Sequence, residues 1–108
     1  MKLYIGGAFQ GQDALARAEN PGAKIFDSYH ETIREAVRNG QDPRILAKEL
    51  CERHSEAVIV ADEVGSGVVP VAAEERAYRE AVGRALCVIA QHSEQVTRVV
   101  CGIGVRIK

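Results

Sequence analysis

The stretch GGAFQGQD, from Gly6 to Asp13, has the glycine spacing of a phosphate-binding loop. Such a loop turns backbone N–H groups toward a phosphate, supplies a lysine to the β and γ phosphates, and places a serine or threonine hydroxyl on Mg²⁺. Gly6, Gly7 and Gly11 meet the backbone requirement. Gln12 and Asp13 stand where the lysine and the hydroxyl belong, so the stretch indicates a nucleotide site with its key side chains replaced.

Two interpretations of this loop remain open. In the first, the loop residues Gly6, Gly7, Gly11, Gln12 and Asp13 still bind a nucleotide weakly through the backbone. In the second, the stretch is a glycine turn followed by a helix from Gln12 that is capped by its own Asp13 and stabilised by a pair between Asp13 and Arg17. The absence of the lysine removes a charge-assisted contact with phosphate, which favours the second interpretation.

Carboxylates follow two further apolar segments. Asp27 ends the segment AKIF, and Asp62 and Glu63 follow VIVA. Carboxylate oxygens are preferred ligands of Mg²⁺, so these three residues are candidate metal ligands beside a nucleotide. Acidic residues also cap helices, so the assignment depends on whether the fold brings the three together.

Apolar periodicity predicts strands that alternate with helices. Strands are expected at residues 2–5, 23–26, 57–61 and 96–101, and the tail from residue 102 is a candidate edge strand. Helices are expected at residues 12–18, 28–40, from 42 onward and at 73–92. Ser28 with Glu31 fits a capping box, and Asp42 before Pro43 fits an N-cap with proline at the first helical position. Ile45 is expected on the buried side of its helix.

This order of elements predicts a single α/β domain over residues 1–108. We expect three layers, with a mainly parallel sheet of about four to five strands and helices on both faces. In such sheets ligands bind beyond the carboxyl ends of the strands. The glycine loop, Asp27 and the pair Asp62–Glu63 all follow predicted strands, so we expect them at one edge of the sheet.

Composition limits the classes of partner. The net charge is −1 and no block of like charges occurs, which argues against nucleic acid. No apolar run has the length of a membrane span or a signal peptide, so we expect a cytoplasmic protein with no membrane partner. Three cysteines match no metal spacing and are expected to be buried: Cys51, Cys87 and Cys101. Three histidines are expected on helix surfaces: His30, His54 and His92.

The second half of the chain resembles a known family. VIVADEVGSGVVP, ERAYREAVGRALCVIA and VTRVVCGIGVRIK are similar to segments of the bifunctional adenosylcobinamide kinase and adenosylcobinamide-phosphate guanylyltransferase family of cobalamin biosynthesis. GGAFQGQD resembles that family's GGARSGKS-type loop, and Asp27 matches the acid of its Asp-Cys-Leu-Thr strand end. The resemblance implies a shortened P-loop NTPase-like (RecA-like) fold. It also implies a binding or assembly role for Glu63, Val64, Gly65, Gly67, Pro70, Arg76 and Arg79.

The departures from the family are chemically informative. The family is longer between its first helix and the Asp strand, and that segment carries a histidine that becomes guanylylated. No residue here matches that histidine, and His30 lies beyond Asp27. Leu86 and Cys87 replace an Asn-Gln pair of the long helix. Without the histidine the family's covalent guanylyl transfer is not available, and without the loop lysine and hydroxyl the kinase reaction loses its main electrostatic stabilisation.

These features favour a shortened homologue, non-catalytic or weakly active, that acts as a nucleotide- or corrinoid-binding or assembly module. One alternative is an active kinase or nucleotidyltransferase of the pathway, with Asp13, Asp27 or Glu63 holding Mg²⁺ and Arg17 or Arg76 replacing the lysine. A second is a fold retained for an unrelated structural role. The candidate cofactors are GTP or ATP with Mg²⁺. The candidate partners are further copies of the chain, as the family's oligomers imply, or a full-length family member.

Overall fold

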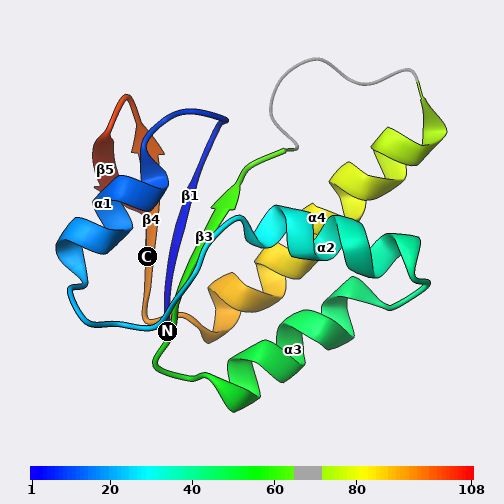
Figure 1. Ribbon diagram of the computed structural model, residues 1–108, viewed down its shortest axis with the longest axis horizontal. Coiled ribbons are helices and arrows are strands. Elements are labelled where there is room, and N and C mark those ends of the chain that lie inside the picture. Colours follow the sequence, from blue (N-terminus) through cyan, green and yellow to red (C-terminus); the bar gives the residue numbers. More distant parts are fainter. Residues whose placement is uncertain (65–71) are drawn as a thin grey trace.

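The computed structural model describes residues 1–64 and 72–108, which form a five-stranded sheet and four helices (Figure 1). The elements are β1 (Lys2–Gly6), α1 (Gln12–Glu19), β2 (Ile25–Phe26), α2 (Tyr29–Arg38), α3 (Pro43–Arg53), β3 (Val58–Asp62), α4 (Ala73–His92), β4 (Gln95–Val100) and β5 (Ile103–Arg106). The predicted α/β fold with a mainly parallel sheet is confirmed.

The strand order of the sheet is β2-β3-β1-β4-β5. β1 runs parallel to both β3 and β4, β2 runs parallel to β3, and β5 returns antiparallel to β4. Gly6 at the end of β1 is in register with Asp62 at the end of β3. The loop after β1 and the residues after β3 therefore emerge side by side at the same edge of the sheet.

The two faces of the sheet bury different helices. Tyr4, Val60 and Val99 pack with Ala16 of α1 on one face. Leu3, Ile59 and Val96 belong to the larger core on the other face, which α2, α3 and α4 cover (Figure 1). Its most buried side chains include Ile33, Ile59 and Ile89. Burying one such side chain contributes about 1.5–3 kcal/mol, so the core with more buried side chains contributes the larger hydrophobic stabilisation.

The starts of two helices differ from each other. The Asp42 carboxylate accepts a 2.9 Å hydrogen bond from the Arg44 N–H, and Pro43 opens α3, as predicted. The prediction of a capping box at Ser28 is wrong. Ser28 has a φ of 49°, in the left-handed region, and its side chain makes no cap hydrogen bond. The Glu31 N–H instead donates to the Ser28 carbonyl at 2.9 Å, so backbone alone closes this helix start.

Several burial predictions are also corrected. Ile45 is 59% exposed, because α3 turns Ala47 and Cys51 into the core. Cys87 and Cys101 are exposed, whereas Cys51 is buried as expected. In the described part of the chain, no helix combines the length and the apolar character that a membrane crossing requires.

Candidate functional site

Gln12 follows the loop after β1 as the first residue of α1. It occupies the first turn of α1 and is 5% exposed. Its side-chain nitrogen lies 3.3 Å from the Gly6 carbonyl, 3.1 Å from the Gly7 carbonyl and 2.8 Å from Oδ1 of Asp62. An amide nitrogen has two hydrogens, so these three acceptors use its full donor capacity. The neutral amide therefore holds the loop to the end of β3.

Two glycines permit this arrangement. A Cβ atom on Gly6 would come within 2.6 Å of the Val99 carbonyl oxygen, so only glycine allows β1 to pass so close to β4 here. Gly11 has a φ of 89° and is the N-cap residue of α1. Larger residues adopt that conformation at a cost. The glycines thus serve a strand–turn–helix connection whether or not an anion binds.

His30 meets Asp62 from the first turn of α2. The Asp62 N–H donates a 3.0 Å hydrogen bond to His30 Nδ1, and Nε2 of the ring lies 3.5 Å from Asp62 Oδ2. Because Nδ1 accepts, the neutral ring carries its hydrogen on Nε2, which faces the Asp62 and Glu31 carboxylates. The His30 side chain is only 12% exposed, so the prediction of a surface imidazole is wrong.

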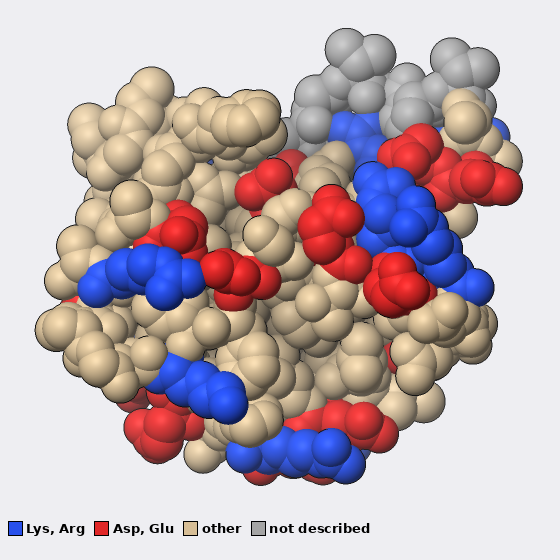
Figure 2. All heavy atoms as spheres, viewed as in Figure 1, with Lys and Arg blue, Asp and Glu red and all other residues tan. Residues whose placement is uncertain are grey.

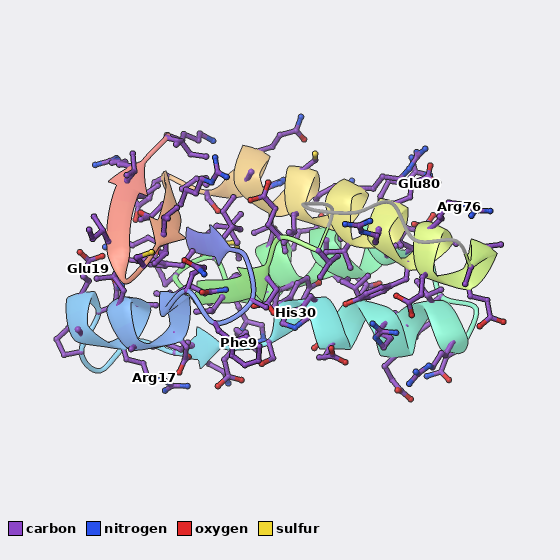
Figure 3. The ribbon with its side chains drawn as sticks, turned by 90° about the horizontal axis from the view of Figure 1, so that it is seen from above. Phe9, Arg17, Glu19, His30, Arg76 and Glu80 are labelled. Atoms are coloured by element: carbon purple, nitrogen blue, oxygen red, sulfur yellow. The ribbon has the colours of Figure 1, made fainter. Side chains whose placement is uncertain are left out.

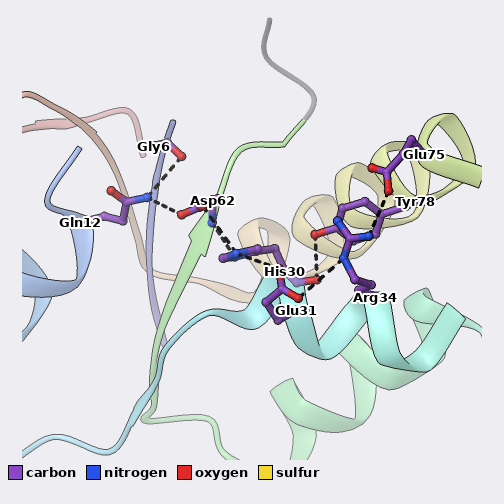
Figure 4. A network of polar contacts seen from close by, with 8 residues as sticks. All are labelled: Gly6, Gln12, His30, Glu31, Arg34, Asp62, Glu75 and Tyr78. Atoms are coloured by element: carbon purple, nitrogen blue, oxygen red, sulfur yellow. Dashed lines mark hydrogen bonds and ion pairs between the residues drawn. The ribbon is translucent and has the colours of Figure 1, made fainter. Parts of the chain in front are cut away.

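The same polar contacts continue to α4 (Figure 4). Arg34 lies 3.6 Å from Glu31 and donates a 3.1 Å hydrogen bond to Glu75 at the start of α4. Its guanidinium also lies 3.9 Å from the centre of the Tyr78 ring, and the Tyr78 hydroxyl donates to the His30 carbonyl at 3.2 Å. The hydrogen bond from Arg34 to Glu75 raises the pKa of the arginine. A continuous network thus joins the loop, α2 and α4.

Arg17 connects two of the predicted acidic residues. Its Nε donates to the Asp13 carboxylate at 3.1 and 3.2 Å, and its Nη2 donates to Asp27 at 2.8 Å. The hydrogen bond with Asp13 raises the pKa of Arg17. The i,i+4 pair of Asp13 and Arg17 is confirmed, but Asp13 does not cap α1, whose N-cap is Gly11 without a side-chain bond. Arg17 is thereby held by two carboxylates.

A cavity of about 340 Å³ opens beside this cluster. Its walls include Asp13, Asp27 and Asp62, together with His30 and the ring of Phe9. The Phe9 side chain is fully exposed at the rim of the cavity (Figure 3). Its backbone has a φ of 62°, in the left-handed region. The expectation that the glycine loop, Asp27 and Asp62 share one edge of the sheet agrees with this geometry.

Glu63 and Val64 lie away from this cavity. The Glu63 N–H donates to the Gly6 carbonyl, and its carboxylate lies 3.9 Å from Arg98 of β4. The Val64 carbonyl accepts from Arg79 of α4. Glu63 and Val64 line a separate groove beside α4. Gly65, Gly67 and Pro70 lie outside the described residues.

Arg76 lies in the first turns of α4, far from Phe9 and Arg17 (Figure 3). The face in Figure 2 intersperses acidic and basic side chains, and an uncharged area covers the β4–β5 turn and the loop after β1. Among the described residues on this face, the basic side chains lie beside acidic ones, an arrangement that does not favour a polyanion.

Comparison with known proteins identifies the family. The profile described as "Cobinamide kinase / cobinamide phosphate guanyltransferase" matches residues 20–107. The bifunctional adenosylcobalamin biosynthesis protein CobU of Escherichia coli strain K12 is 34% identical over 88 residues, which are 81% of this chain and 48% of that protein. The chain belongs to the cobinamide kinase / cobinamide phosphate guanyltransferase family. It spans about half the length of that curated relative.

The family match covers His30, Asp62 and α4 but begins after the glycine loop. For this member of the cobinamide kinase / cobinamide phosphate guanyltransferase family, the chemistry of the loop must therefore be judged from its own side chains. Gln12 offers no positive charge, and its hydrogens already bind protein oxygens. Three carboxylates line the cavity. These groups do not fit a triphosphate, whose negative charge requires cationic donors.

The same test applies to a metal ion. Among residues 1–64 and 72–108, no group of three histidine, cysteine, aspartate or glutamate side chains is placed to hold one. Asp27 pairs with Arg17, Asp62 with Gln12, and Glu63 with Arg98. The three candidate Mg²⁺ ligands thus have separate protein partners, and Glu63 lies in a different groove.

His30 is the site residue that the sequence interpretation missed. One signal was present: it follows Asp27 by three residues, at the start of a helix that begins at the carboxyl end of a strand. In a parallel sheet such positions face the ligand crevice.

Proposed function

We propose that this chain is a family member that binds a pathway ligand and assembles with other copies, without kinase or guanylyltransferase turnover. We infer a corrinoid rather than a nucleoside triphosphate as the ligand, because the cavity is lined by carboxylates and an exposed aromatic ring. The amides of a cobinamide can donate to Asp62 and Asp27, and its apolar edge can contact Phe9. The family's role in cobalamin biosynthesis supports this choice of ligand.

One observation carries the proposal: the side chain of Gln12, where the spacing of a phosphate-binding loop would place a lysine, is a neutral amide whose hydrogens bind protein oxygens. In phosphoryl transfer most of the rate enhancement comes from positioned cations that stabilise charge on the phosphate. Here the buried amide donates its hydrogens to the Gly6 and Gly7 carbonyls and to the Asp62 carboxylate. The adjacent Asp13 adds a negative charge where a hydroxyl would bind Mg²⁺.

The alternative of an active enzyme with Mg²⁺ on Asp27 or Glu63 has no comparable support. Asp27 is bonded to Arg17 beside the cavity, and Glu63 faces Arg98 in the groove beside α4. Arg17, the nearby candidate replacement for the lysine, is already held by Asp13 and Asp27.

The proposal is tested by isothermal calorimetry with adenosylcobinamide, GTP and ATP, each with and without Mg²⁺, followed by product analysis. We expect adenosylcobinamide to bind, the triphosphates to bind weakly or not at all, and no phosphorylated or guanylylated product to form. Thermal unfolding gives a second readout, since a ligand at 100 times its dissociation constant adds about 2.7 kcal/mol to stability. Steady formation of adenosylcobinamide phosphate from ATP would overturn the proposal.

A matched pair of variants locates the site. Phe9→Ala removes a fully exposed ring from the cavity rim, and Ile45→Ala removes a 59% exposed side chain from α3, away from the cavity. Corrinoid affinity should fall in the first variant and stay unchanged in the second. Equal affinities in both would place the ligand elsewhere on the protein.

A further inference from the structure

Two atoms beside the cavity have no hydrogen-bond partner among the described residues. His30 Nε2, which carries the hydrogen of the neutral ring, lies 3.5 Å from Asp62 Oδ2 and 3.6 Å from Glu31 Oε1. Both separations exceed the usual N–H···O length of about 2.7–3.2 Å. Gln12 binds Oδ1 of Asp62 and leaves Oδ2 without a donor in the described part of the chain. The pair therefore offers one donor and one acceptor, 3.5 Å apart.

The contacts around this pair fix which atom donates and which accepts. The Asp62 N–H donates to His30 Nδ1 at 3.0 Å, so the ring hydrogen stays on Nε2. Gln12 holds the Asp62 carboxylate through Oδ1 at 2.8 Å. The Tyr78 hydroxyl donates to the His30 carbonyl at 3.2 Å and steadies the first turn of α2 (Figure 4). Both groups are thus held in place before a ligand arrives, which lowers the entropic cost of binding.

The pair is open to the cavity. The side chains of His30 and Asp62 are 12% and 29% exposed, and both residues line the cavity of about 340 Å³. In the described residues, the buried side-chain atom that lacks a partner is the Tyr29 hydroxyl, so neither atom of the pair is sealed in the same way. A ligand group in the cavity can therefore reach both.

The donor and the acceptor select among ligand groups. A carboxylate could accept from Nε2 but would lie beside the Asp62 carboxylate, with Asp13 and Asp27 on the same cavity wall. An ammonium could donate to Oδ2 but would leave the Nε2 hydrogen without an acceptor. A primary carboxamide is neutral and planar, and one edge carries both an oxygen acceptor and an N–H donor. It is the group that satisfies both atoms without placing like charges together.

The same geometry excludes ordinary secondary amides. In a trans amide the C=O and the N–H point in opposite directions, and the cis form is strongly disfavoured. A primary amide always has one N–H on the same edge as its oxygen, and a small lactam ring holds its N–H there. Methylation of the amide nitrogen in an open chain should therefore abolish recognition.

We propose that His30 and Asp62 together bind a primary carboxamide, with Nε2–H donating to the amide oxygen and Oδ2 accepting from the amide N–H. This inference deepens the proposed function and rests on it for the corrinoid, whose amides would supply the group. It makes the two residues specificity determinants, because an amide binds where the corresponding carboxylate is repelled. An amidation must then act on the ligand before this chain binds it.

The first experiment titrates the ¹⁵N-labelled full chain with four small probes and follows the NMR signals of His30 Nε2 and the Asp62 amide. The probes are propionamide, N-methylpropionamide, propionate and the cyclic lactam pyrrolidone. Propionamide and pyrrolidone should shift both signals in a saturable way, at least about tenfold more tightly than the other two. A propionamide that shifts neither signal, or an N-methylpropionamide that binds equally well, overturns the proposal.

The second experiment changes the acceptor. In Asp62→Asn the amide oxygen can still accept from Gln12, while an N–H replaces Oδ2. Affinity for propionamide should fall at least about tenfold, and affinity for propionate should rise. Glu52→Gln removes the same charge from an exposed position on α3 and should change neither affinity. Equal effects of the two variants would mean that overall charge, and not the pair, determines which probe binds, and would overturn the assignment.

Calorimetry with adenosylcobinamide separates this inference from the proposed function. If propionamide binds as expected and adenosylcobinamide does not, the carboxamide site stands and the corrinoid is wrong. If adenosylcobinamide binds the wild-type protein and Asp62→Asn equally well, the corrinoid stands and the role of the pair is wrong. Circular dichroism verifies that both variants are folded.

Discussion

The side-chain amide of Gln12 donates a 2.8 Å hydrogen bond to the carboxylate of Asp62, between the carboxyl ends of β1 and β3. The two residues are 50 positions apart in the chain. The same nitrogen binds the Gly6 and Gly7 carbonyls, so a neutral group closes the loop. The loop is thus internally satisfied, and its shape does not depend on a bound anion.

The first prediction concerns stability. Gln12→Met keeps the length of the side chain but removes its N–H donor. The Gly6 and Gly7 carbonyls and the Asp62 carboxylate then lose the hydrogen bonds that Gln12 donates. The free energy of unfolding should fall by about 1–3 kcal/mol, the usual cost of unpaired buried polar groups. Gln91→Met, at an exposed position of α4, is the matched control and should change stability by less than about 0.5 kcal/mol. Denaturant titration measures both, and similar losses would mean that the Gln12 contacts contribute nothing specific.

Much of the fold was predictable because its signals are local. AVIVA is a continuous β-branched run, which fits a central strand buried on both faces, and β3 is indeed the neighbour of β1 and β2. Asp42 before Pro43 signals a helix start through its immediate neighbours. Ser28 carries the same kind of signal, but its backbone enters the left-handed region and the cap does not form.

The candidate site was predictable only in part. The strand ends located Asp27, Asp62 and the loop, since topology fixes where strand ends meet. The bond of Gln12 to Asp62 and the partial burial of His30 depend on how α1 and α2 are rotated about their axes. That rotation is set by packing of Ala16, Tyr29 and Ile33 against the sheet. The rotation of these helices cannot be read directly from a single sequence.

The second prediction concerns His30. Because Asp62 N–H donates to Nδ1, the neutral imidazole should carry its hydrogen on Nε2, which long-range ¹⁵N–¹H NMR spectra detect directly. His30→Asn places an acceptor oxygen near the position of Nδ1, whereas His30→Phe removes the acceptor. The Phe variant should lose about 1–3 kcal/mol of stability and the Asn variant less. An Nδ1–H tautomer in the wild-type protein would contradict the hydrogen bond.

The third prediction concerns alkaline pH. The Tyr29 hydroxyl is buried without a hydrogen-bond partner among the described residues, and burial, followed by the nearby Cys51, raises its pKa from 10.0 to about 12. Between these values the unfolded chain loses the phenol proton while the folded chain keeps it. Unfolding then releases a proton, so the free energy of unfolding falls as pH rises through this window.

Tyr29→Phe should remove this share of the pH dependence and, at neutral pH, raise stability by about 1 kcal/mol, because no partner is lost. Tyr4→Phe is the contrasting variant. The Tyr4 hydroxyl donates to Glu19 at 2.7 Å and accepts from Asn20 at 3.0 Å, so its removal should lower stability at neutral pH. Denaturant titrations from neutral to pH 12 measure both variants. A Tyr29→Phe curve with the wild-type slope above pH 10 would contradict the assignment.

The last prediction gives the loop the lysine and the hydroxyl that a phosphate-binding loop carries. Gln12→Lys introduces an ammonium at the end of the loop, and Asp13→Ser removes a carboxylate and adds a hydroxyl at the N-terminus of α1. Together they change the site from one that repels a triphosphate to one that attracts it. The dissociation constant for GTP or ATP should fall at least about tenfold, which is 1.4 kcal/mol of binding free energy. The gain should shrink as salt is added.

The control for this pair is Gln91→Lys with Glu94→Ser, two exposed positions outside the loop. It makes the same change in net charge, so it separates a local effect from general attraction of an anion. Calorimetry with and without Mg²⁺ compares the two double variants with the wild-type protein. A gain confined to the loop variant means that Gln12 and Asp13 limit triphosphate binding in this chain. Equal gains in both, or none in either, would show that these two side chains are not what limits it.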